Sequence, residues 1–224
     1  MSTWVVTGAN RGIGLEMCRQ LVAGGHTVVG TARDPSKAGA LRELGARVEA
    51  LEARDQGSAG ALGHALGDLA VDVLVNCAGR GGGGPGIAEL DWEMVAEYFW
   101  INTIGPMRVT QALLGSLRRG AAKKIAHLST NLASIADNRS GGHYAYRSSK
   151  AALNMMNRSL AHELAAEGFT CLALHPGWVQ TDMGGPRAPL PVADSVAGLL
   201  GVIDRAGPAD SGKFLKYDGT ELSW

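Results

Sequence analysis

Short apolar runs rich in β-branched residues alternate with longer amphipathic runs along the whole chain, and this alternation constrains the fold most strongly. The short runs predict seven strands, at Trp4–Thr7, Thr27–Thr31, Val48–Leu51, Val71–Asn76, Lys124–Ser129, Thr170–His175 and Gly212–Tyr217. The longer runs predict helices at Ile13–Ala23, Pro35–Leu44, Ser58–Leu69, Trp92–Leu117, Ala145–Glu167 and Ser195–Asp204. Several strands are apolar on both faces, which is typical of a parallel sheet covered by helices on both sides. We therefore expect an α/β fold with a doubly wound parallel sheet, and no linker divides residues 1–224 into two domains.

The composition fits a globular domain and argues against several classes of protein. Of the 224 residues 46% are hydrophobic and 19% charged, which is enough apolar material for a buried core. The 21 basic and 21 acidic residues cancel, so bulk charge does not favour a nucleic-acid partner. No stretch reaches the roughly 18 apolar residues of a membrane span, and the first residues lack a signal-peptide pattern. Three scattered cysteines and six histidines show no disulfide or metal-ligand spacing, so we expect a cytoplasmic protein without a metal or a membrane partner.

A glycine-rich loop lies where the first expected strand runs into the first expected helix. Its sequence is Thr7-Gly8-Ala9-Asn10-Arg11-Gly12-Ile13-Gly14, with the glycine spacing G-x-x-x-G-x-G. Glycines at such a junction permit a tight turn and let a pyrophosphate approach the helix N-terminus, whose free N–H groups and dipole favour anions. The loop therefore predicts a Rossmann-type dinucleotide site, with these cofactor-binding candidates: Gly8, Asn10, Arg11, Gly12, Ile13 and Gly14.

The residues after the second expected strand bear on the choice between NADP and NAD. Asp34 lies 20 residues after Gly14, where an acidic side chain would contact the adenosine ribose of NAD. Pro35 follows it, however, and Asp before Pro is typical of a helix N-cap, which would occupy the carboxylate. Arg33 and Arg11 are then the charged side chains available to a 2′-phosphate. We expect NADPH/NADP+ as the cofactor and keep NADH as the alternative.

Tyr146 and Lys150 are four residues apart at the start of an expected helix, so they share one face of it. A nearby ammonium group favours tyrosinate and would lower the pKa of the phenol from its reference value of about 10. Such a phenol can give a proton to a carbonyl oxygen as hydride arrives, or accept one from an alcohol. Tyr144 is the competing tyrosine, but the residue four positions on is Ser148, which offers no cation. The pair therefore predicts a catalytic acid–base centre.

These motifs and several others resemble the classical short-chain dehydrogenase/reductase family along essentially the whole chain. The matching elements, in order, are Thr7–Gly14, Asn76–Gly79, Asn102, Ser129–Thr130, Tyr146 with Lys150, and His175–Thr181. The stretches YAYRSSK and HPGWVQTDMGG are most similar to small carbonyl-reductase-like and C-factor-like members. The resemblance implies a nicotinamide-dependent reaction between a carbonyl group and an alcohol.

The resemblance also implies roles for individual residues. At the reacting end, Tyr146 would be the acid–base group, Lys150 would also hold the nicotinamide ribose, and Asn102 would anchor a water that relays protons. The residues that would line the rest of the cofactor include Glu52, near the adenine amine, and Asn76, Ala78 and Gly79. The nicotinamide and its carboxamide would be held by Pro176, Gly177, Val179 and Thr181.

The hydroxyl residue at the end of the fifth expected strand departs from the family pattern. The family's catalytic serine generally stands closer to the tyrosine, whereas the corresponding Thr130 lies 16 residues before Tyr146, with Ser129 beside it. A threonine hydroxyl can hydrogen-bond a substrate carbonyl, although its methyl group narrows the site. We expect Thr130 to act, with Ser129 and, more remotely, Ser134 as alternatives.

Other features stay open in the sequence. The Gly- and Pro-rich stretch 184–191 could close as a lid over bound cofactor or form an ordinary loop, and Trp178 is a candidate for substrate contact. The helices expected at Trp92–Leu117 and Ala145–Glu167 could pair with another subunit in a dimer or tetramer, or could simply cover the sheet. The histidines at strand ends are expected to be hydrogen-bonded core or turn residues.

Taken together, the motifs predict an NADPH-dependent oxidoreductase that reduces a small-molecule ketone or aldehyde to an alcohol, or runs the reverse reaction. The alternative from another class is a cofactor-binding regulatory or developmental-signalling protein with little or no turnover, which the C-factor-like resemblance implies. An enzyme of the same fold acting on a nucleotide sugar is a further alternative, but little sequence follows the last expected strand to bind the sugar. No motif fixes the pocket walls, so the sequence leaves the substrate, its stereochemistry and the number of subunits open.

Overall fold

Seven parallel strands form one sheet in the computed structural model, which describes all residues 1–224. The strands are β1 (Thr3–Val6), β2 (Thr27–Ala32), β3 (Arg47–Ala50), β4 (Val73–Asn76), β5 (Lys124–Leu128), β6 (Thr170–His175) and β7 (Phe214–Lys216). Their order across the sheet is β3-β2-β1-β4-β5-β6-β7, and every neighbouring pair is parallel. The doubly wound α/β fold expected from the sequence is confirmed, including all seven strands.

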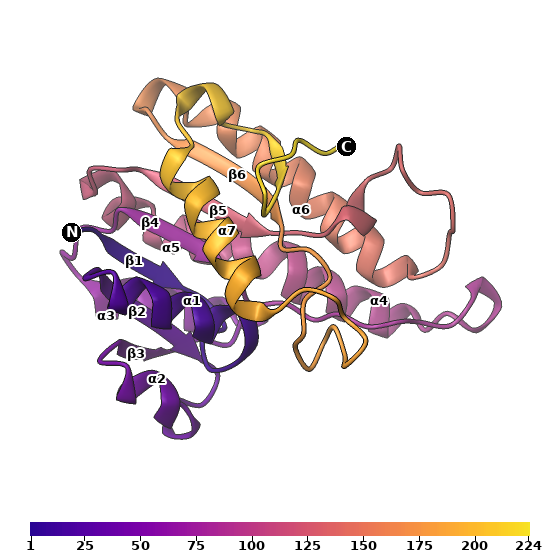
Figure 1. Cartoon of the computed structure of the whole chain (residues 1–224), viewed down its shortest axis with the longest axis horizontal. Coiled ribbons are helices and arrows are strands. Elements are labelled where there is room, and N and C mark those ends of the chain that lie inside the picture. The colour runs from indigo at the N-terminus through magenta and orange to yellow at the C-terminus, as the bar shows by residue number, and fades with distance from the viewer.

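Helices cover both faces of the sheet (Figure 1). They are α1 (Gly12–Ala23), α2 (Gly39–Glu43), α3 (Gln56–Leu66), α4 (Trp92–Phe99), α5 (Gly105–Arg119), α6 (Tyr144–Glu163) and α7 (Val192–Arg205). Helices α1 and α7 pack together on one face, while α3, α5 and the end of α6 cover the other. None of these helices combines the length and the apolar character that crossing a membrane requires.

Side chains alternate along the central strands between two separate cores. In β1, Val6 belongs to the core under α1 and α7, whereas Val5 belongs to the core under α3 and α5. Val75 and Leu74 of β4 divide in the same way. Because both faces of the sheet are buried, these strands read in the sequence as continuous apolar runs.

The chain is helical throughout the range expected at Trp92–Leu117, but a π-helical turn at Trp100–Ile104, which was not expected, divides it into α4 and α5. Pro106 explains the break, since it has no N–H to donate to the carbonyl group four residues back. The N–H group of Gly105 instead reaches the carbonyl oxygen of Trp100, five residues away. This wider turn carries Asn102, which is fully buried.

The helix expected over Pro35–Leu44 is also interrupted. Pro35–Lys37 form a 3₁₀ turn, and α2 covers only the five residues that begin at Gly39. Gly39 is a poor helix former, so α2 does not extend back to join the 3₁₀ turn at Pro35–Lys37. The expected role of Asp34 is confirmed, because its Oδ1 accepts a hydrogen bond from the Ser36 N–H at 3.0 Å at the start of the 3₁₀ turn.

The carboxyl ends of the strands meet at one edge of the sheet. The strand order reverses beside β1, between its neighbours β2 and β4, and α/β folds bind ligands in the crevice at such a switch point. The segments that carry the expected site residues follow the strands at this edge: Thr7–Gly14 after β1, Asn76–Gly79 at the end of β4, Ser129–Thr130 after β5, and Pro176–Thr181 after β6.

Two buried histidines make the folded state sensitive to acid. Burial lowers the pKa of His127 to about 3 and that of His175 to about 4. Each ring accepts one hydrogen bond as a neutral group, from the side-chain amide of Asn76 at 3.2 Å and from the Gly177 N–H at 3.4 Å, respectively. An unfolded histidine titrates near pH 6.5, so from pH 6.5 down to about 4 the unfolded chain binds more protons than the folded one. The two histidines therefore do not reduce the free energy of unfolding above pH 6.5, but they reduce it increasingly as the pH falls below 6.5.

We expect the free energy of unfolding to fall by about 1.4 kcal/mol per pH unit for each of these histidines below about pH 6. Urea denaturation of wild type and His127→Gln between pH 4.5 and 7.5 measures this slope. The slope of the free energy of unfolding against pH should be smaller in the variant by the contribution of one histidine. An unchanged slope would show that folding does not lower the pKa of His127.

Candidate active site

The glycine loop forms a cradle of unpaired N–H groups at the start of α1. The helix begins without a side chain that caps it and without an acidic residue in its first turn. The N–H groups of Gly12, Ile13 and Gly14 find no acceptor within the protein. A Cβ on Gly14 would lie 2.5 Å from the carbonyl oxygen of Gly8, so only glycine permits this turn. The free N–H groups and the positive end of the helix dipole suit a phosphate or a pyrophosphate.

The segment after β4 packs directly against the glycine loop. Thr7 Oγ1 accepts a hydrogen bond from the Ala78 N–H at 3.0 Å, which ties the ends of β1 and β4 together. Gly79 follows, and a Cβ there would lie 3.3 Å from Asn102 Oδ1 and 3.5 Å from Lys150 Nζ. The absence of a side chain at Gly79 thus brings Asn102 and Lys150 within reach of the crevice.

The charged residues expected at the adenosine end differ in how they are engaged. Arg33 is exposed after β2 and makes no hydrogen bond or ion pair. The carboxylate of the adjacent Asp34 is occupied by Ser36, and these hydrogen bonds lower the pKa of Asp34. Arg11 forms an exposed ion pair with Asp182, at 2.8 Å between Nη1 and Oδ2. The Arg33 guanidinium at the end of β2 therefore has no partner, whereas the Arg11 guanidinium in the glycine loop is paired with Asp182.

Tyr146 and Lys150 lie one turn apart on α6. Lys150 is buried, its Nζ donates to the carbonyl oxygen of Leu128 at 2.6 Å, and burial lowers its pKa to about 8. Burial also raises the pKa of Tyr146, while a hydrogen bond with Thr130 acts in the opposite direction. The expectation that Lys150 lowers the pKa of Tyr146 is therefore wrong. Burial has the largest effect on this pKa and raises it, and the Lys150 ammonium group is directed to the Leu128 carbonyl oxygen.

The three hydroxyl candidates around the end of β5 have different surroundings. Thr130 Oγ1 accepts a hydrogen bond from the Leu132 N–H at 3.2 Å, and Thr130 is among the groups that act to lower the pKa of Tyr146. Ser129 donates instead to Asn154 Oδ1 on α6 at 2.6 Å, in the interior. Ser134 donates at 3.2 Å to the carbonyl oxygen of the last residue in the chain. Of the three hydroxyl groups, that of Thr130 is the one that bears on the pKa of Tyr146.

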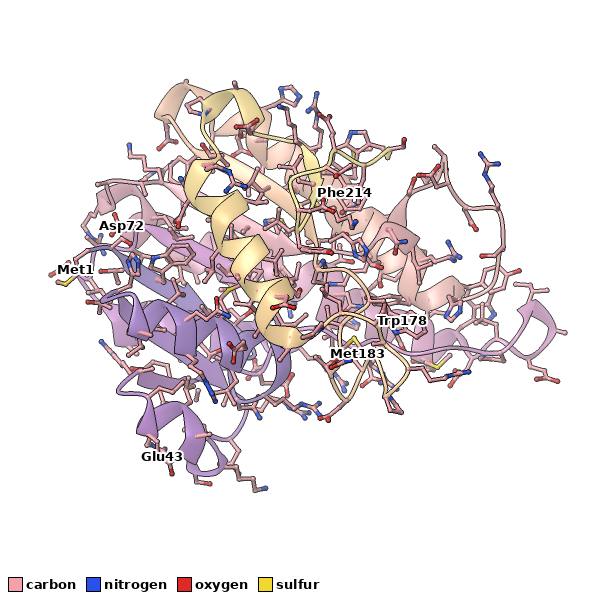
Figure 2. All side chains as sticks on the ribbon, viewed as in Figure 1. Met1, Glu43, Asp72, Trp178, Met183 and Phe214 are labelled. Atoms are coloured by element: carbon pink, nitrogen blue, oxygen red, sulfur yellow. The ribbon has the colours of Figure 1, made fainter.

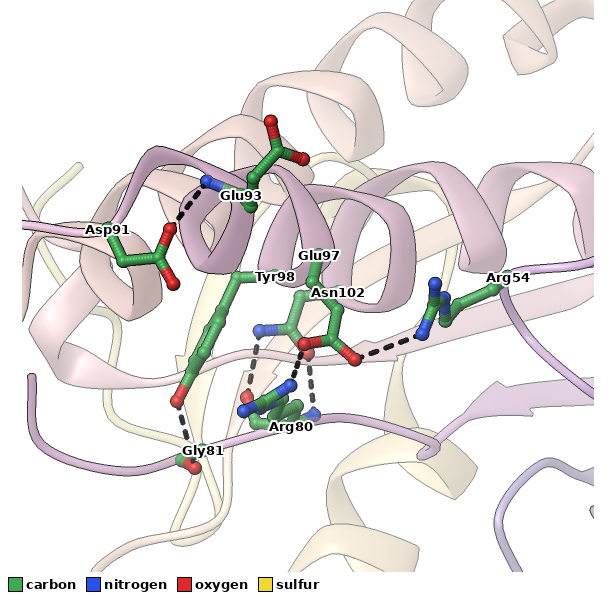
Figure 3. Close-up of polar contacts among 8 residues, drawn as sticks. All are labelled: Arg54, Arg80, Gly81, Asp91, Glu93, Glu97, Tyr98 and Asn102. Carbon is green, nitrogen blue, oxygen red and sulfur yellow. Dashed lines mark hydrogen bonds and ion pairs between the residues drawn. The ribbon is translucent and has the colours of Figure 1, made fainter.

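Asn102 joins the π turn to the segment after β4. Its Oδ1 accepts from the Arg80 N–H at 2.8 Å, and its Nδ2 donates to the Arg80 carbonyl oxygen at 2.9 Å (Figure 3). Nδ2 also donates to Ser149 Oγ on α6 at 3.1 Å. Both N–H groups of the amide are used in these bonds, whereas Oδ1 accepts only one, so a relaying water could bind to Oδ1 or to main-chain groups.

The segment after β6 bridges the two walls of the crevice. The Thr181 methyl carbon would lie 3.5 Å from a Cβ on Gly12 of the glycine loop. Met183 packs so closely on Gly81, after β4, that its sulfur leaves no room for a Cβ there. Figure 2 labels Met183 and the exposed Trp178 on these loops. A segment that touches both walls has the placement that a lid requires.

A small hollow lies beside Tyr146, between α4 and α6. The backbone of Gly82–Gly84 forms part of its lining, and the other side chains around it are those of Leu90, Met94, Tyr98, His143 and Tyr144. The sequence interpretation missed Tyr98, although it lies four residues before Asn102 on the same helical segment. The spacing alone would have placed Tyr98 beside Asn102.

Comparisons with known proteins decide the family. Residues 2–189 match the model of the short chain dehydrogenases. The chain belongs to this family of oxidoreductases. It is 53% identical to C-signal of Myxococcus xanthus over 154 residues, which cover 69% of this chain and 93% of that protein. Among solved structures it is similar to the carbonyl reductase Sniffer of D. melanogaster, with 31% identity, a TM-score of 0.94 and 100% of both chains covered. It is also similar to the NADPH-bound carbonyl reductase from chicken fatty liver, with 34% identity, a TM-score of 0.92 and coverage of 100% and 99%.

In this short-chain dehydrogenase, two expected cofactor residues direct their side chains to protein groups. The Asn76 side chain donates to Thr110 Oγ1 on α5 at 3.1 Å and is buried. The Glu52 carboxylate accepts from the Arg54 N–H at 3.1 Å, just after β3. Of the nicotinamide-end residues, Pro176 is held through its carbonyl oxygen by Ser195 Oγ at 2.6 Å. The Glu52 carboxylate keeps further acceptor sites, and Asn76 Oδ1 has no partner within the protein.

Proposed function

We propose that this short-chain dehydrogenase is an NADPH-dependent oxidoreductase that interconverts a small carbonyl compound and its alcohol, with residues 1–224 forming one nicotinamide-binding domain. The observation that carries the proposal is the position of Tyr146 on α6, one turn before the buried Lys150, whose Nζ binds the Leu128 carbonyl oxygen at the end of β5. A proton donor, a second hydroxyl and a cation at the carboxyl edge of a Rossmann-type sheet are the groups that carbonyl reduction needs.

Each of these residues has a separate task. Bound NADPH would supply the hydride that the carbonyl carbon receives. Tyr146 gives its phenolic proton to the carbonyl oxygen, and Thr130 donates a hydrogen bond to the same oxygen. In the reverse direction the tyrosinate takes the proton of the alcohol. Lys150, one turn further along α6, would hold the nicotinamide ribose.

The residues around the crevice fit NADPH. The unpaired N–H groups at the start of α1 suit the pyrophosphate. Arg33, which has no partner in the protein, and Arg11 suit the 2′-phosphate. We assign the remaining cofactor contacts to Gly8, Asn10, Gly12, Ile13, Gly14, Glu52, Asn76, Ala78, Gly79, Pro176, Gly177, Val179 and Thr181. Asn102 would anchor the water that relays protons.

Replacing Arg33 with alanine should raise the KM for NADPH about 10- to 100-fold, because a charge-assisted hydrogen bond contributes about 1.5–3 kcal/mol. The KM for NADH should stay close to that of wild type, since NADH has no 2′-phosphate. Initial rates with each cofactor measure both values. Arg205→Ala, at the exposed end of α7, is the matched control. An equal loss with both cofactors would contradict the assignment of Arg33 to the phosphate.

The reaction class is tested by the oxidation of NADPH and NADH, followed by absorbance, with a panel of ketones, aldehydes and quinones. We expect turnover that prefers NADPH. Turnover that prefers NADH would contradict the cofactor assignment and transfer the ribose contact to Asp34. Tight NADPH binding without turnover of any carbonyl compound would contradict the proposed enzyme.

That last outcome would support a second candidate function, a cofactor-binding signalling protein. The 53% identity to C-signal favours this candidate over other non-enzymatic roles. It predicts that the cofactor stabilises the fold, which a thermal shift with NADPH would detect, and that no carbonyl compound accelerates NADPH oxidation.

A further inference from the structure

We propose that Asp182 is a specificity-determining residue for the cofactor: its carboxylate competes with the 2′-phosphate of NADPH for the Arg11 guanidinium, so that binding of the phosphate releases the segment after β6. The inference rests on the proposed NADPH binding and adds a means of regulation to it. The segment concerned is residues 178–190, here called the strap, which lies between β6 and α7. Figure 2 labels Trp178 and Met183 on it.

Hydrogen bonds within the strap make it a compact unit. Its two ends are joined, because the Gln180 N–H donates to the Leu190 carbonyl oxygen at 2.9 Å. The Gln180 side chain donates to the Ala188 carbonyl oxygen at 3.1 Å. The Trp178 indole N–H donates to the Gly184 carbonyl oxygen at 2.8 Å. Because the segment is closed on itself, a tie at one residue bears on the position of the whole strap.

One residue ties the strap to the glycine loop. Asp182 Oδ2 accepts a hydrogen bond from Arg11 Nη1 at 2.8 Å. The other hydrogen bonds of the strap run within residues 178–190. Met183 packs on Gly81 of the segment after β4, but this contact is apolar. The Arg11–Asp182 pair is therefore the polar bond that holds the strap across the crevice.

The Arg11–Asp182 pair is exposed and easily replaced. The side chains of Arg11 and Asp182 keep 68% and 79% of their surface exposed, and a single hydrogen bond joins them. Exposed ion pairs contribute little to stability, because water screens the charges and both side chains lose freedom. A phosphate dianion carries more charge than a carboxylate and can accept two parallel hydrogen bonds from a guanidinium group. Arg11 therefore gains when it exchanges Asp182 for a phosphate.

The fold places Arg11 next to the end of β2, where the 2′-phosphate is expected. The Ala9 N–H donates to the Thr31 carbonyl oxygen at 2.8 Å, which joins the glycine loop to β2. Arg11 and Arg33 each follow this junction by two residues. A phosphate held by Arg33 at the junction is therefore a second partner for the Arg11 guanidinium, in competition with Asp182.

NADH has no 2′-phosphate, so it leaves the Arg11–Asp182 pair intact and the strap tied. Asp182 thus has two effects on the choice of cofactor. It weakens the binding of the phosphate by occupying Arg11, and it makes release of the strap depend on the phosphate. Because the strap touches both walls of the crevice, the crevice widens only when a 2′-phosphate is bound.

The test uses adenosine 2′,5′-bisphosphate, which carries the 2′-phosphate, and 5′-AMP, which lacks it. Neither has a nicotinamide end, so turnover does not enter the measurement. Calorimetric titration of wild type, Asp182→Asn, Arg11→Ala and the double variant gives the ratio of the two Kd values for each protein. Glu167→Gln is the matched control, because Glu167 forms an exposed ion pair with Arg118 just before β6, at the opposite edge of the sheet.

The 2′-phosphate should tighten binding to wild type and to the Glu167 control about 10-fold. Asp182→Asn should increase this gain about threefold, because Arg11 then has no competing partner. Arg11→Ala should reduce the gain about fivefold, and adding Asp182→Asn to it should have no further effect. Simple repulsion between Asp182 and the phosphate would instead give Asp182→Asn the same effect with and without Arg11, and this result would overturn the competition.

Release of the strap is measured by limited digestion with trypsin after Arg187, an exposed residue of the strap. The cleavage rate follows the fraction of molecules in which the segment is open. Adenosine 2′,5′-bisphosphate should raise this rate about threefold in wild type, and 5′-AMP should leave it unchanged. In Asp182→Asn the rate should already be raised without a nucleotide. Equal rates in wild type and Asp182→Asn would overturn the role of Asp182 as a tie.

The same titrations separate this inference from the proposed function. Tighter binding of the 2′-phosphate to wild type, with the same ratio of Kd values in Asp182→Asn, would overturn the role of Asp182 and leave the NADPH assignment intact. Equal Kd values of the two nucleotides for wild type would overturn the NADPH assignment and this inference with it.

Discussion

Tyr146→Phe is expected to lower kcat about a thousandfold while the Kd for NADPH stays within about threefold of wild type. The Tyr146 phenol is the proposed proton donor, and phenylalanine keeps the ring and its contact with Tyr98 but has no proton to give. Single-turnover rates measure the chemical step, and quenching of protein fluorescence by NADPH measures binding. A large fall in the rate with unchanged binding is the signature of a group that acts only in the transition state.

Tyr144→Phe is the matched control, because it removes the same hydroxyl group two residues earlier on α6. Tyr144 lies 41% exposed at the rim of the hollow, and its hydroxyl makes no hydrogen bond within the protein. Its kcat should remain within about threefold of wild type. Loss of activity in Tyr144→Phe together with activity in Tyr146→Phe would reverse the assignment of the acid–base group.

The features that could be predicted from the sequence are those set by neighbouring residues. The strands follow from apolar runs buried on both faces, and the cap at Asp34 follows from the proline after it. The glycine loop is likewise local, since its turn needs glycine at Gly14 whatever lies elsewhere in the chain. These interpretations depend on steric and hydrogen-bonding rules that act over a few residues.

The features that could not be predicted depend on contacts between distant segments. The break at Trp100–Ile104 was missed because the apolar pattern continues through it, whereas Pro106 and the bonds from Asn102 to Arg80, 22 residues away in sequence, favour a wider turn. The pKa of Tyr146 was misjudged for a related reason. Helical spacing places Lys150 on the same face, but it does not show that the ammonium group is directed to Leu128 on β5. Burial, which no spacing reveals, then determines the direction of the shift.

The choice between Thr130 and Ser129 is of this second kind, and it leads to a prediction with opposite outcomes for two adjacent residues. Thr130→Ala should lower kcat about 100-fold, because a donor to the developing oxyanion is lost, and should leave NADPH affinity unchanged. Thr130→Ser keeps the hydroxyl group and removes the methyl group, so its kcat should stay within about fivefold of wild type.

Ser129→Ala should instead retain kcat and lose stability. The side chains of β5 alternate between the two faces of the sheet, and Ser129 faces α6, where it donates to Asn154 Oδ1 at 2.6 Å. Asn154 Nδ2 already lacks a partner in this buried place, so removal of the serine leaves the whole amide unpaired. The free energy of unfolding should fall by about 1–3 kcal/mol, measured by urea denaturation. If Ser129→Ala lost activity and Thr130→Ala kept it, Ser129 would be the catalytic hydroxyl, and the end of β5 would have to twist to bring it to Tyr146.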